Sequence, residues 1–393
     1  MSAPEPGGPP RFDVLTEQVL REGRSLKWSR YGAAIGAFVA EMDFGTAPAV
    51  TRSLLDTVER GQLGYATPED VEEMARACGG WLARRYGWEV PAASISPLAD
   101  VIAGLQAAIE RFTPPGSPVV LPTPAYMPFL GVPGSLGREL IEVPMIDRAG
   151  RMEYDLDGIA AAFDRGARLV VHVNPHNPLG RVFDVEEQLA LADVVTAAGA
   201  RVFADEIHAP LVYPGAVHRP YASLSPDTAR HTVTATSTSK AWNVPGLKTA
   251  QLILSDPADV DHWARVGFLY GHGASSPGLR AAAAAYDEGG DWLDDVLGYL
   301  DENRRLLADL LAERLPQVRF TPPEGTYLAW LDCSRLGLEA SAGAFFLERA
   351  GVALVDGPEC GAPGAGHVRL NFATPRPVLT TIVERMAAAV AAR

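Results

Sequence analysis

The sequence lacks the features that mark secreted and membrane proteins. It has only three cysteines among 393 residues, and Cys78, Cys333 and Cys360 are too far apart to form a CxxC pair. Three separated cysteines fit no complete disulfide framework, so we expect free thiols. No apolar run approaches the roughly 20 residues that span a bilayer, and the first ten residues lack the basic and apolar regions of a signal peptide. We therefore expect a cytoplasmic protein without membrane contacts and with a disordered tail at 1–10.

Basic residues are also scarce. The chain has 34 Lys and Arg against 48 Asp and Glu, a formal net charge of −14 at pH 7. An acidic surface disfavours nonspecific binding to nucleic acid, so we expect no nucleic-acid partner. The string DEIH at 205–208 is similar to a helicase DExH box, but the GxxxxGK[ST] loop that a helicase needs is missing. No GxSxG motif indicates a serine hydrolase either.

What the sequence does contain is an alternation of short, Val-rich runs with helical patterns. This alternation is typical of a parallel sheet with helices on both faces. Because the runs are short and uniformly apolar, they indicate buried strands. The predicted strands cover residues 118–121, 169–173, 201–204, 232–236 and 251–254.

Several helices have clear ends in the sequence. Asp184 and Glu187 can form a capping box, and Gly199 can end the same helix. Another helix is predicted to begin near Thr46, with Pro48 in its first turn. A long amphipathic pattern at 292–315 is predicted to lead into a second, α+β domain. That domain would contain strands at 327–331 and 367–372 and helices at 342–350 and 377–392.

Polar and aromatic residues follow four of the predicted strands, at 122–129, 174–180, 205–208 and 237–240. Ligands of open α/β sheets bind beyond the carboxyl ends of the strands, so we expect these segments to meet. Lys240 lies there among small hydroxyl residues and ahead of an apolar segment, a setting that could lower its pKa as a Schiff-base lysine requires. The alternative is an ordinary solvated lysine. Ser237, Ser239 and Lys248 could then bind a phosphate.

Four further residues could serve an aromatic cofactor or its substrate. Asp205 could accept a hydrogen bond from a protonated pyridine nitrogen, or be a plain loop carboxylate. Asn177 could donate to a ring hydroxyl, or be a turn residue. Tyr126 could lie flat on the ring, or pack in the core. Arg369, inside an apolar strand pattern, needs a partner, which could be a substrate carboxylate or an internal Asp or Glu.

A metal site is a further possibility, because His172, His176, His208 and His218 lie in one region. No cysteine accompanies them and their spacing matches no zinc pattern, so we expect no metal.

Three strings in this region resemble a known family. NPHNPLG at 174–180, DEIHAPLVYPGAVHRPYASLS at 205–225 and STSKAWNVPGLK at 237–248 resemble the MalY/PatB group of cystathionine β-lyases, or cysteine-conjugate C–S lyases, within the pyridoxal-phosphate (PLP) aminotransferase superfamily of fold type I. The likeness extends from about Trp28 to the C-terminus. It includes VAEMDF at 39–44, GYATPE at 64–69, PTPAYMPF at 122–129, GTYLAWLD at 325–332 and RLNFA at 369–373.

The resemblance implies the fold and its domains. It implies the PLP-dependent transferase fold of type I, an α/β fold. In it, a large domain has a mostly parallel sheet of the seven-stranded type flanked by helices, and a smaller domain is α+β. We expect a segment at 11–45 that joins the small domain, a large PLP-binding domain at 46–290 and the small domain at 291–393.

The resemblance also implies roles for individual residues. Lys240 would hold PLP as a Schiff base, Asp205 would pair with the ring nitrogen, and Tyr126 would stack on the ring. The remaining cofactor contacts would come from Asn177 and His208 near the 3-hydroxyl, and from Ser237, Ser239, Lys248 and the backbone N–H groups of Val101 and Ile102 at the phosphate. Arg369, Asp43 and Tyr327 would bind the substrate. Tyr65 would reach the phosphate of a neighbouring subunit, which implies a homodimer with shared active sites.

Three residues depart from the family pattern. Asp100 stands where a glycine usually opens the phosphate-binding helix, and we expect its carboxylate to turn away and cap that helix. Glu41 and Phe38 replace a common aspartate and tryptophan, which the resemblance places near the substrate entrance.

The implied reaction is β-elimination of L-cystathionine or another L-cysteine S-conjugate to a thiol, pyruvate and ammonia. The alternative is an aminotransferase of class I/II acting on an L-amino acid, which shares every step up to the Cα carbanion. The sequence leaves open whether the leaving thiol is homocysteine, a small alkyl thiol or a bulky conjugate.

Overall fold

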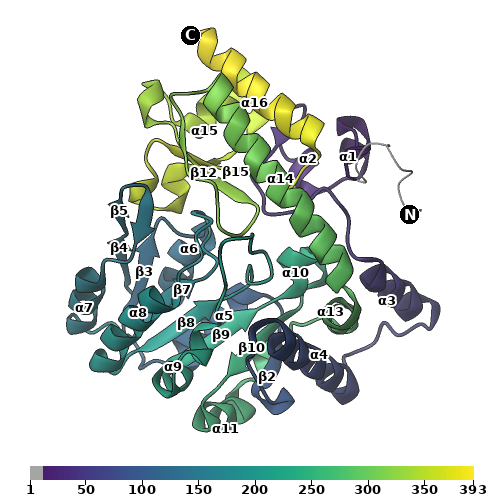
Figure 1. The fold of residues 1–393 in the computed structure, drawn as a ribbon. Helices are drawn as coiled ribbons and strands as arrows, with labels where there is room; N and C mark the ends of the chain where they lie inside the picture. Colours follow the sequence, from purple (N-terminus) through teal and green to yellow (C-terminus); the bar gives the residue numbers. More distant parts are fainter. Residues whose placement is uncertain (1–11) are drawn as a thin grey trace.

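The computed structural model describes residues 12–393, so the predicted tail at 1–10 and Arg11 lie outside the described residues (Figure 1). Its centre is a seven-stranded sheet in the order β2-β10-β9-β8-β7-β3-β4, and β10 alone runs antiparallel to its neighbours. The strands are β2 (Ile95–Leu98), β3 (Val119–Thr123), β4 (Leu140–Pro144), β7 (Leu169–Val173), β8 (Arg201–Asp205), β9 (Thr232–Thr236) and β10 (Ala250–Leu254). The predicted α/β class with a mostly parallel sheet is confirmed.

The five predicted strands are present, with ends shifted by a residue or two, but two strands were not predicted. Both β2 and β4 are edge strands. Pro97 interrupts the apolar pattern of β2. In β4, Ile141 and Val143 are buried, whereas Glu142 and Pro144 are exposed. Edge strands tolerate proline and solvent, so they lack the continuous apolar signal of buried strands.

Helices cover both faces of this sheet, as the alternation of strand side chains requires. Leu121 and Phe203 pack on one face with α5 (Val101–Arg111), α6 (Met127–Ser135) and α11 (Pro257–Val266). Val120 and Val202 pack on the other face with α7 (Leu156–Asp164) and α8 (Val185–Ala198). The shorter helices α9 (Pro226–His231) and α12 (Phe268–Gly271) complete this part.

The predicted ends of α8 are confirmed. Asp184 and Glu187 form a capping box, and Gly199 follows in the left-handed conformation. The helix predicted near Thr46 begins at Pro48 instead, as α3 (Pro48–Glu59). It packs with α4 (Pro68–Tyr86) and α13 (Ser276–Glu288) beside β2 and β10.

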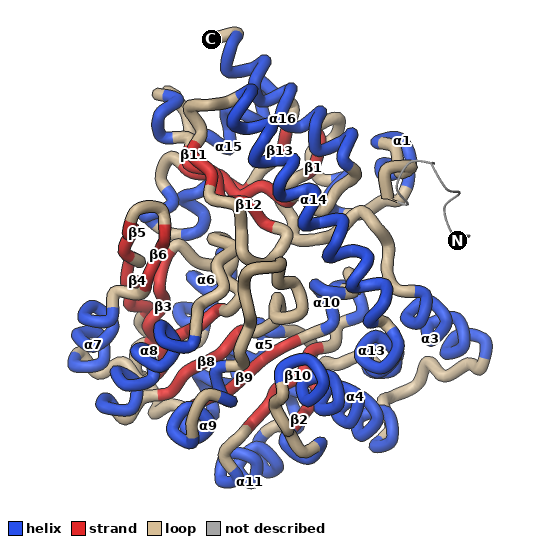
Figure 2. The backbone as a smooth tube through the Cα atoms, in the orientation of Figure 1, coloured by secondary structure: helices blue, strands red, loops and turns tan. Residues whose placement is uncertain are grey.

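The long helix α14 (Gly290–Arg314) runs from α13 into the C-terminal part (Figure 2). There an antiparallel sheet in the order β11-β12-β15-β14 packs with α15 (Ala342–Phe345) and α16 (Arg376–Ala391). Its strands are β11 (Arg319–Phe320), β12 (Leu328–Asp332), β14 (Val355–Asp356) and β15 (His367–Asn371). The helix predicted at 342–350 is α15 followed by a π-helix at Phe346–Ala350.

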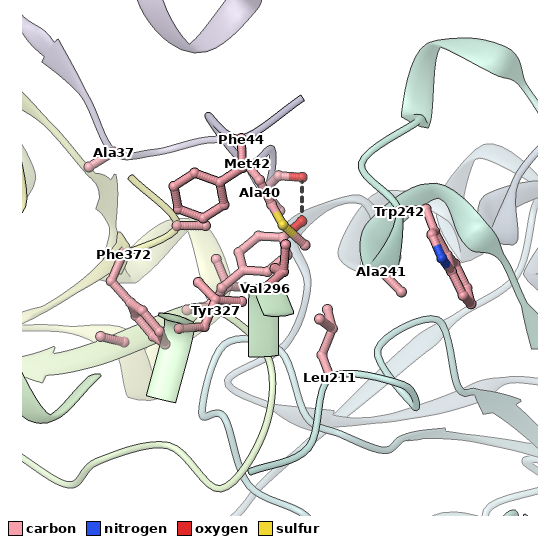
Figure 3. Close-up of a cluster of buried hydrophobic side chains, with 14 of the residues drawn as sticks. Ala37, Ala40, Met42, Phe44, Leu211, Ala241, Trp242, Val296, Tyr327 and Phe372 are labelled. Carbon is pink, nitrogen blue, oxygen red and sulfur yellow. Dashed lines mark hydrogen bonds between the residues drawn. The ribbon is translucent and has the colours of Figure 1, made fainter. Parts of the chain in front are cut away.

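The N-terminal segment lies with the C-terminal part. After the short helices α1 (Glu17–Glu22) and α2 (Leu26–Ser29), β1 (Ile35–Gly36) pairs in parallel with β13 (Val352–Ala353). Figure 3 shows part of one apolar cluster that includes Phe44 of this segment, Phe372 of the C-terminal part and Trp242. A hairpin, β5 (Ile146–Arg148) with β6 (Arg151–Glu153), extends beyond β4. The domain limits given above stay a prediction.

No helix within residues 12–393 combines the length and apolar character that crossing a membrane requires.

Candidate active site

The carboxyl ends of β3, β7, β8 and β9 lie side by side at one edge of the sheet, because these strands are parallel neighbours. Beyond this edge is a cavity of about 400 Å³. The predicted residues that line it are Val101, Ile102, Tyr126, Asn177, Asp205, His208, Ser237, Ser239, Lys240, Lys248 and Arg369. The structure therefore brings together most of the predicted site, with Arg369 coming from the C-terminal part.

Lys240 lies on the one-turn helix α10 (Thr238–Ala241), directly after β9. Its Nζ donates to the Ala40 carbonyl at 2.9 Å, and no carboxylate in residues 12–393 forms an ion pair with it. Burial, helped by the cationic Arg369, lowers the pKa of Lys240 to about 8, although Glu41 and Asp205 oppose this shift. A lysine with this pKa is neutral far more often than a surface lysine and can act as a nucleophile or base.

Asp205 ends β8 and is 4% exposed. Its Oδ1 accepts a hydrogen bond from the Ile207 backbone N–H at 3.1 Å. Burial raises the pKa of Asp205 to about 7, and Glu206 adds to this, while the hydrogen bond and Lys240 act in the opposite direction. A buried carboxyl group of this kind becomes a stable anion when a cation is placed beside it.

Arg369 is 2% exposed and has only neutral partners in the described part of the chain. Its Nη1 donates to Asn177 Oδ1 at 2.9 Å, and its Nη2 donates to the Phe38 carbonyl at 2.7 Å. Its Nε has no acceptor among the described residues. The internal Asp or Glu partner that the sequence allowed is therefore absent within residues 12–393. The guanidinium group remains available for a carboxylate from outside the protein.

Other polar side chains in the cavity wall also have atoms that can form further hydrogen bonds. His208 Nδ1 is buried without a hydrogen-bond partner. Burial, with Lys240 and Arg369 nearby, holds the pKa of His208 well below its usual value, so its ring is neutral. Asn177 accepts from Arg369 through Oδ1, which leaves its Nδ2 as a donor. Tyr126 precedes α6 and packs edge-on against Phe129, with 5.3 Å between ring centroids.

Asp100 caps the helix as we expected, but it also lines the cavity. It is the N-cap of α5, where its Oδ1 accepts from the Ala103 N–H at 2.9 Å and its Oδ2 pairs with Lys248 Nζ at 3.0 Å. The N–H groups of Val101 and Ile102 lie in the first turn of α5, where backbone donors have no partner within the helix. This helix end can bind an anion, with Lys248 beside it.

Three predicted site residues have other roles or lie elsewhere. Asp43, which we expected to bind the substrate, does not line the cavity: its carboxylate accepts from Lys27 Nζ at 2.9 Å and from Trp28 Nε1 at 2.8 Å. Tyr327 does not line the cavity either, and its hydroxyl donates to the Ala40 carbonyl at 2.9 Å (Figure 3). Tyr65 is 89% exposed and lies outside the cavity.

The predicted phosphate donor Ser237 lines the cavity but already has hydrogen-bond partners. Its hydroxyl donates to the Thr249 carbonyl at 2.7 Å and accepts from the Ser239 N–H at 3.0 Å. Its hydroxyl proton therefore already forms a hydrogen bond within the protein. Ser239, one residue before Lys240, lines the cavity and stays the other predicted phosphate donor.

Some residues that line the cavity were not predicted from the sequence. Leu26, Arg30 and Tyr31 of the N-terminal segment and Glu359 of the C-terminal part line the cavity with the departing residue Phe38. Glu41, the other departure, does not line it but acts electrostatically on Lys240. The only signal was a pair of charged and aromatic residues, Arg30 and Tyr31, shortly before the VAEMDF string.

A larger cavity, about 630 Å³, lies between the β5–β6 hairpin and the β11–β12 strands. Its cations are already paired, Arg181 with Glu187 at 2.8 Å and Arg319 with Asp332. The zinc alternative also finds no support, since His172 shares hydrogen bonds with Tyr154 and Gln188. No group of metal-binding residues occurs in the described chain.

Comparison with known proteins decides the family. The model for aminotransferases of class I and II matches residues 39–386. The chain belongs to this family. Its relatives include a cystathionine β-lyase of Corynebacterium glutamicum, 40% identical over 96% of this chain and 99% of that protein. Cystathionine β-lyase PatB of Bacillus subtilis is 33% identical over 92% of this chain and 94% of its own.

Solved structures agree with this assignment to the class I and II family. A protein assigned as a PLP-dependent β-cystathionase from Corynebacterium diphtheriae superimposes with a TM-score of 0.91 at 40% identity, over 97% of this chain and 99% of the other. The resemblance to the lyases of the MalY/PatB group, first seen in short strings, therefore extends over nearly the whole chain.

Proposed function

We propose that this protein is a PLP-dependent C–S β-lyase that cleaves L-cystathionine or related L-cysteine thioethers. The reaction with cystathionine consumes one water and yields homocysteine, pyruvate and ammonia. The observation that carries the proposal is the combination of a lysine of lowered pKa, a buried carboxyl group and an arginine without a carboxylate partner around one cavity. The relatives that share this chain over nearly its full length are named for the same reaction.

The residues of the cavity fit PLP. Lys240 would hold the aldehyde carbon covalently, Asp205 the ring nitrogen, and Tyr126 a face of the ring. The unpartnered His208 Nδ1 and the free Nδ2 of Asn177 suit the ring oxygen. The N–H groups of Val101 and Ile102, with Ser239 and Lys248, suit the phosphate. When bound, PLP supplies an electron sink for the carbanion formed at the substrate Cα.

Residues of this chain bind the substrate, transfer the proton and keep the ring nitrogen protonated. Arg369 binds the substrate carboxylate and, with it fixed, orients the Cα–H bond toward Lys240. The neutral amine of Lys240 would act as the base that takes the Cα proton. Asp205 stays anionic beside the ring nitrogen and keeps that nitrogen protonated. The electron pair left at Cα then expels the thiolate as the Cβ–S bond breaks, and water releases pyruvate and ammonia.

The proposed substrate sites are shared in a homodimer. The supporting surface consists of exposed apolar side chains: Leu55, Val58, Leu63, Tyr65, Phe268 and Leu269. Tyr65 and Phe268 both pack against His272, at 6.2 Å and 5.6 Å between ring centroids, so they belong to one patch. Apolar patches of this kind are typical of subunit interfaces. From such an interface Tyr65 would reach the phosphate site of a second copy.

The test is to incubate the purified, PLP-loaded protein with L-cystathionine in the absence of any 2-oxo acid. The lyase releases pyruvate and a free thiol in equal amounts. A strict requirement for an oxo-acid acceptor would instead identify an aminotransferase. Lys240→Ala should abolish pyruvate release and the visible absorbance of the bound cofactor, and comparable turnover by this variant would contradict the role of Lys240.

A further inference from the structure

The outer part of the active-site cavity carries two opposite charges that the proposed chemistry does not use. Arg30 and Glu359 both line the cavity and both are exposed. Neither forms an ion pair with the other or with any other residue of 12–393. Arg369, in contrast, is buried and accounts for the substrate α-carboxylate.

Arg30 is held in place by its surroundings. It follows α2, whose Lys27 and Trp28 are fixed by buried contacts to Asp43. Its guanidinium carbon lies 5.6 Å from the ring centroid of Tyr31 and 5.9 Å from that of Phe38. These rings contact each other edge-on at 4.9 Å. Stacking on two rings orients the guanidinium group without consuming its N–H donors.

Glu359 is fixed on the C-terminal side of the same cavity. It lies in the short 3₁₀ segment Gly357–Cys360, where its Oε1 accepts from the Asp356 N–H at 3.1 Å. Its second oxygen is left for another donor.

With the α-carboxylate at Arg369 and the Cα at Lys240, the group on the far side of the sulfur atom is the part of the substrate that extends toward the opening. Resting on the proposed lyase function, we propose that Arg30 and Glu359 recognise a leaving group that is itself an amino acid, with Arg30 binding its carboxylate and Glu359 its ammonium group. The pair thereby favours cystathionine-like thioethers over S-alkyl cysteines.

Four substrates separate the two charges. L-Cystathionine carries both distal groups, and S-(3-carboxypropyl)-L-cysteine lacks only the distal ammonium. S-(3-aminopropyl)-L-cysteine lacks only the distal carboxylate, and S-propyl-L-cysteine lacks both. Pyruvate release by the PLP-loaded protein gives kcat/KM for each, and the value for the S-propyl compound is the reference for each variant.

The variants are Arg30→Gln and Glu359→Gln; the amide oxygen of glutamine at 359 can still accept from the Asp356 N–H. Arg30→Gln should lower kcat/KM about tenfold for the two carboxylate-bearing thioethers relative to the S-propyl compound, since a charge-assisted hydrogen bond is lost. In this variant, kcat/KM for S-(3-aminopropyl)-L-cysteine relative to that for the S-propyl compound should stay unchanged. Glu359→Gln should lower the ratio about threefold for the two ammonium-bearing thioethers only, because the group is exposed and offers one oxygen.

Arg24→Gln and Glu348→Gln are matched controls, because both residues are exposed and neither lines the cavity. Their substrate ratios should equal those of the unaltered protein. Unchanged ratios in Arg30→Gln and Glu359→Gln, with pyruvate still formed from the S-propyl compound, would overturn this inference alone. Absence of pyruvate from all four substrates would overturn the proposed function and this inference with it.

Discussion

Charged side chains without an opposite charge define the active site at the scale of single residues. Lys240 donates to a backbone carbonyl, and Arg369 donates to an amide oxygen, a carbonyl and a thioether sulfur. Burying a charge without a counterion costs free energy. Protein stability therefore gains nothing from these groups as they stand, and their placement is explained by a ligand that brings the missing charges.

Asp205→Asn tests this view through catalysis. An amide cannot keep the ring nitrogen protonated, so the electron sink weakens. We expect a loss of about a hundredfold or more in kcat for pyruvate release, in the range typical of removed acid–base groups. Cofactor absorbance, measured in parallel, separates a loss of chemistry from a loss of PLP. Turnover within a few-fold of the unaltered protein would contradict the role of Asp205.

The same residue makes the stability of the PLP-free protein depend on pH. The pKa of Asp205 is raised from 3.8 to about 7 by folding. Between these values the folded protein keeps a proton that the unfolded chain has lost, so stability falls as pH rises. Asp205→Asn removes this dependence. The free energy of unfolding of this variant, relative to that of the unaltered protein, should rise between pH 4 and 7 by up to about 4 kcal/mol. Urea denaturation at several pH values measures it. If the difference in unfolding free energy between the two proteins did not change with pH, the raised pKa of the buried Asp205 would be contradicted.

At the scale of elements, the N-terminus of α5 combines an anion site with an anionic cap. Asp100 caps the helix and neutralises Lys248. Its charge also repels a phosphate group at the same helix end. Asn is an equally good N-cap, so Asp100→Asn should preserve the helix while it frees Lys248.

We therefore expect Asp100→Asn to lower the dissociation constant of PLP several-fold, as measured by fluorescence titration of the PLP-free protein. Asp184→Asn, an identical change at the cap of α8 on the far side of the sheet, is the control and should leave PLP affinity unchanged. Weaker binding by the Asp100 variant would show that this carboxylate does not face the phosphate.

At the scale of the whole molecule, the active site lies where three separate stretches of the chain meet. The large sheet supplies Lys240 and Asp205, the C-terminal part supplies Arg369, and the N-terminal segment supplies the Ala40 carbonyl. A second copy would add Tyr65 through the apolar patch around α12.

Leu269→Asp tests that assembly. Leu269 is 74% exposed, so a charge there costs little in a monomer but is buried unpaired in a dimer. We expect the unaltered protein to sediment as a dimer and the variant to sediment as a monomer with weakened PLP binding. Val217→Asp, at another exposed apolar position, should leave the dimer intact. A dimeric Leu269→Asp variant would exclude this patch as the interface.

The class of fold and most of the cavity wall follow from local signals along the chain. Short buried strands and cap residues are local signals, and parallel strands bring the residues that follow them to one edge whatever the details of packing. That is why Asn177, Asp205 and Lys240 were expected to lie at one edge of the sheet, whereas their individual roles and the position of Asp100 were inferred from the family resemblance.

Contacts between segments far apart in the chain could not be predicted from such local signals. Tyr327 binds the Ala40 carbonyl 287 residues away, and Lys240 reaches the same atom across 200 residues. Asp43 pairs with Lys27, and Arg30 of the N-terminal segment lines the same cavity as Arg369 of the C-terminal part. Local periodicity says which face of an element is buried but not which distant side chain it meets, because that choice depends on the packing of the whole core.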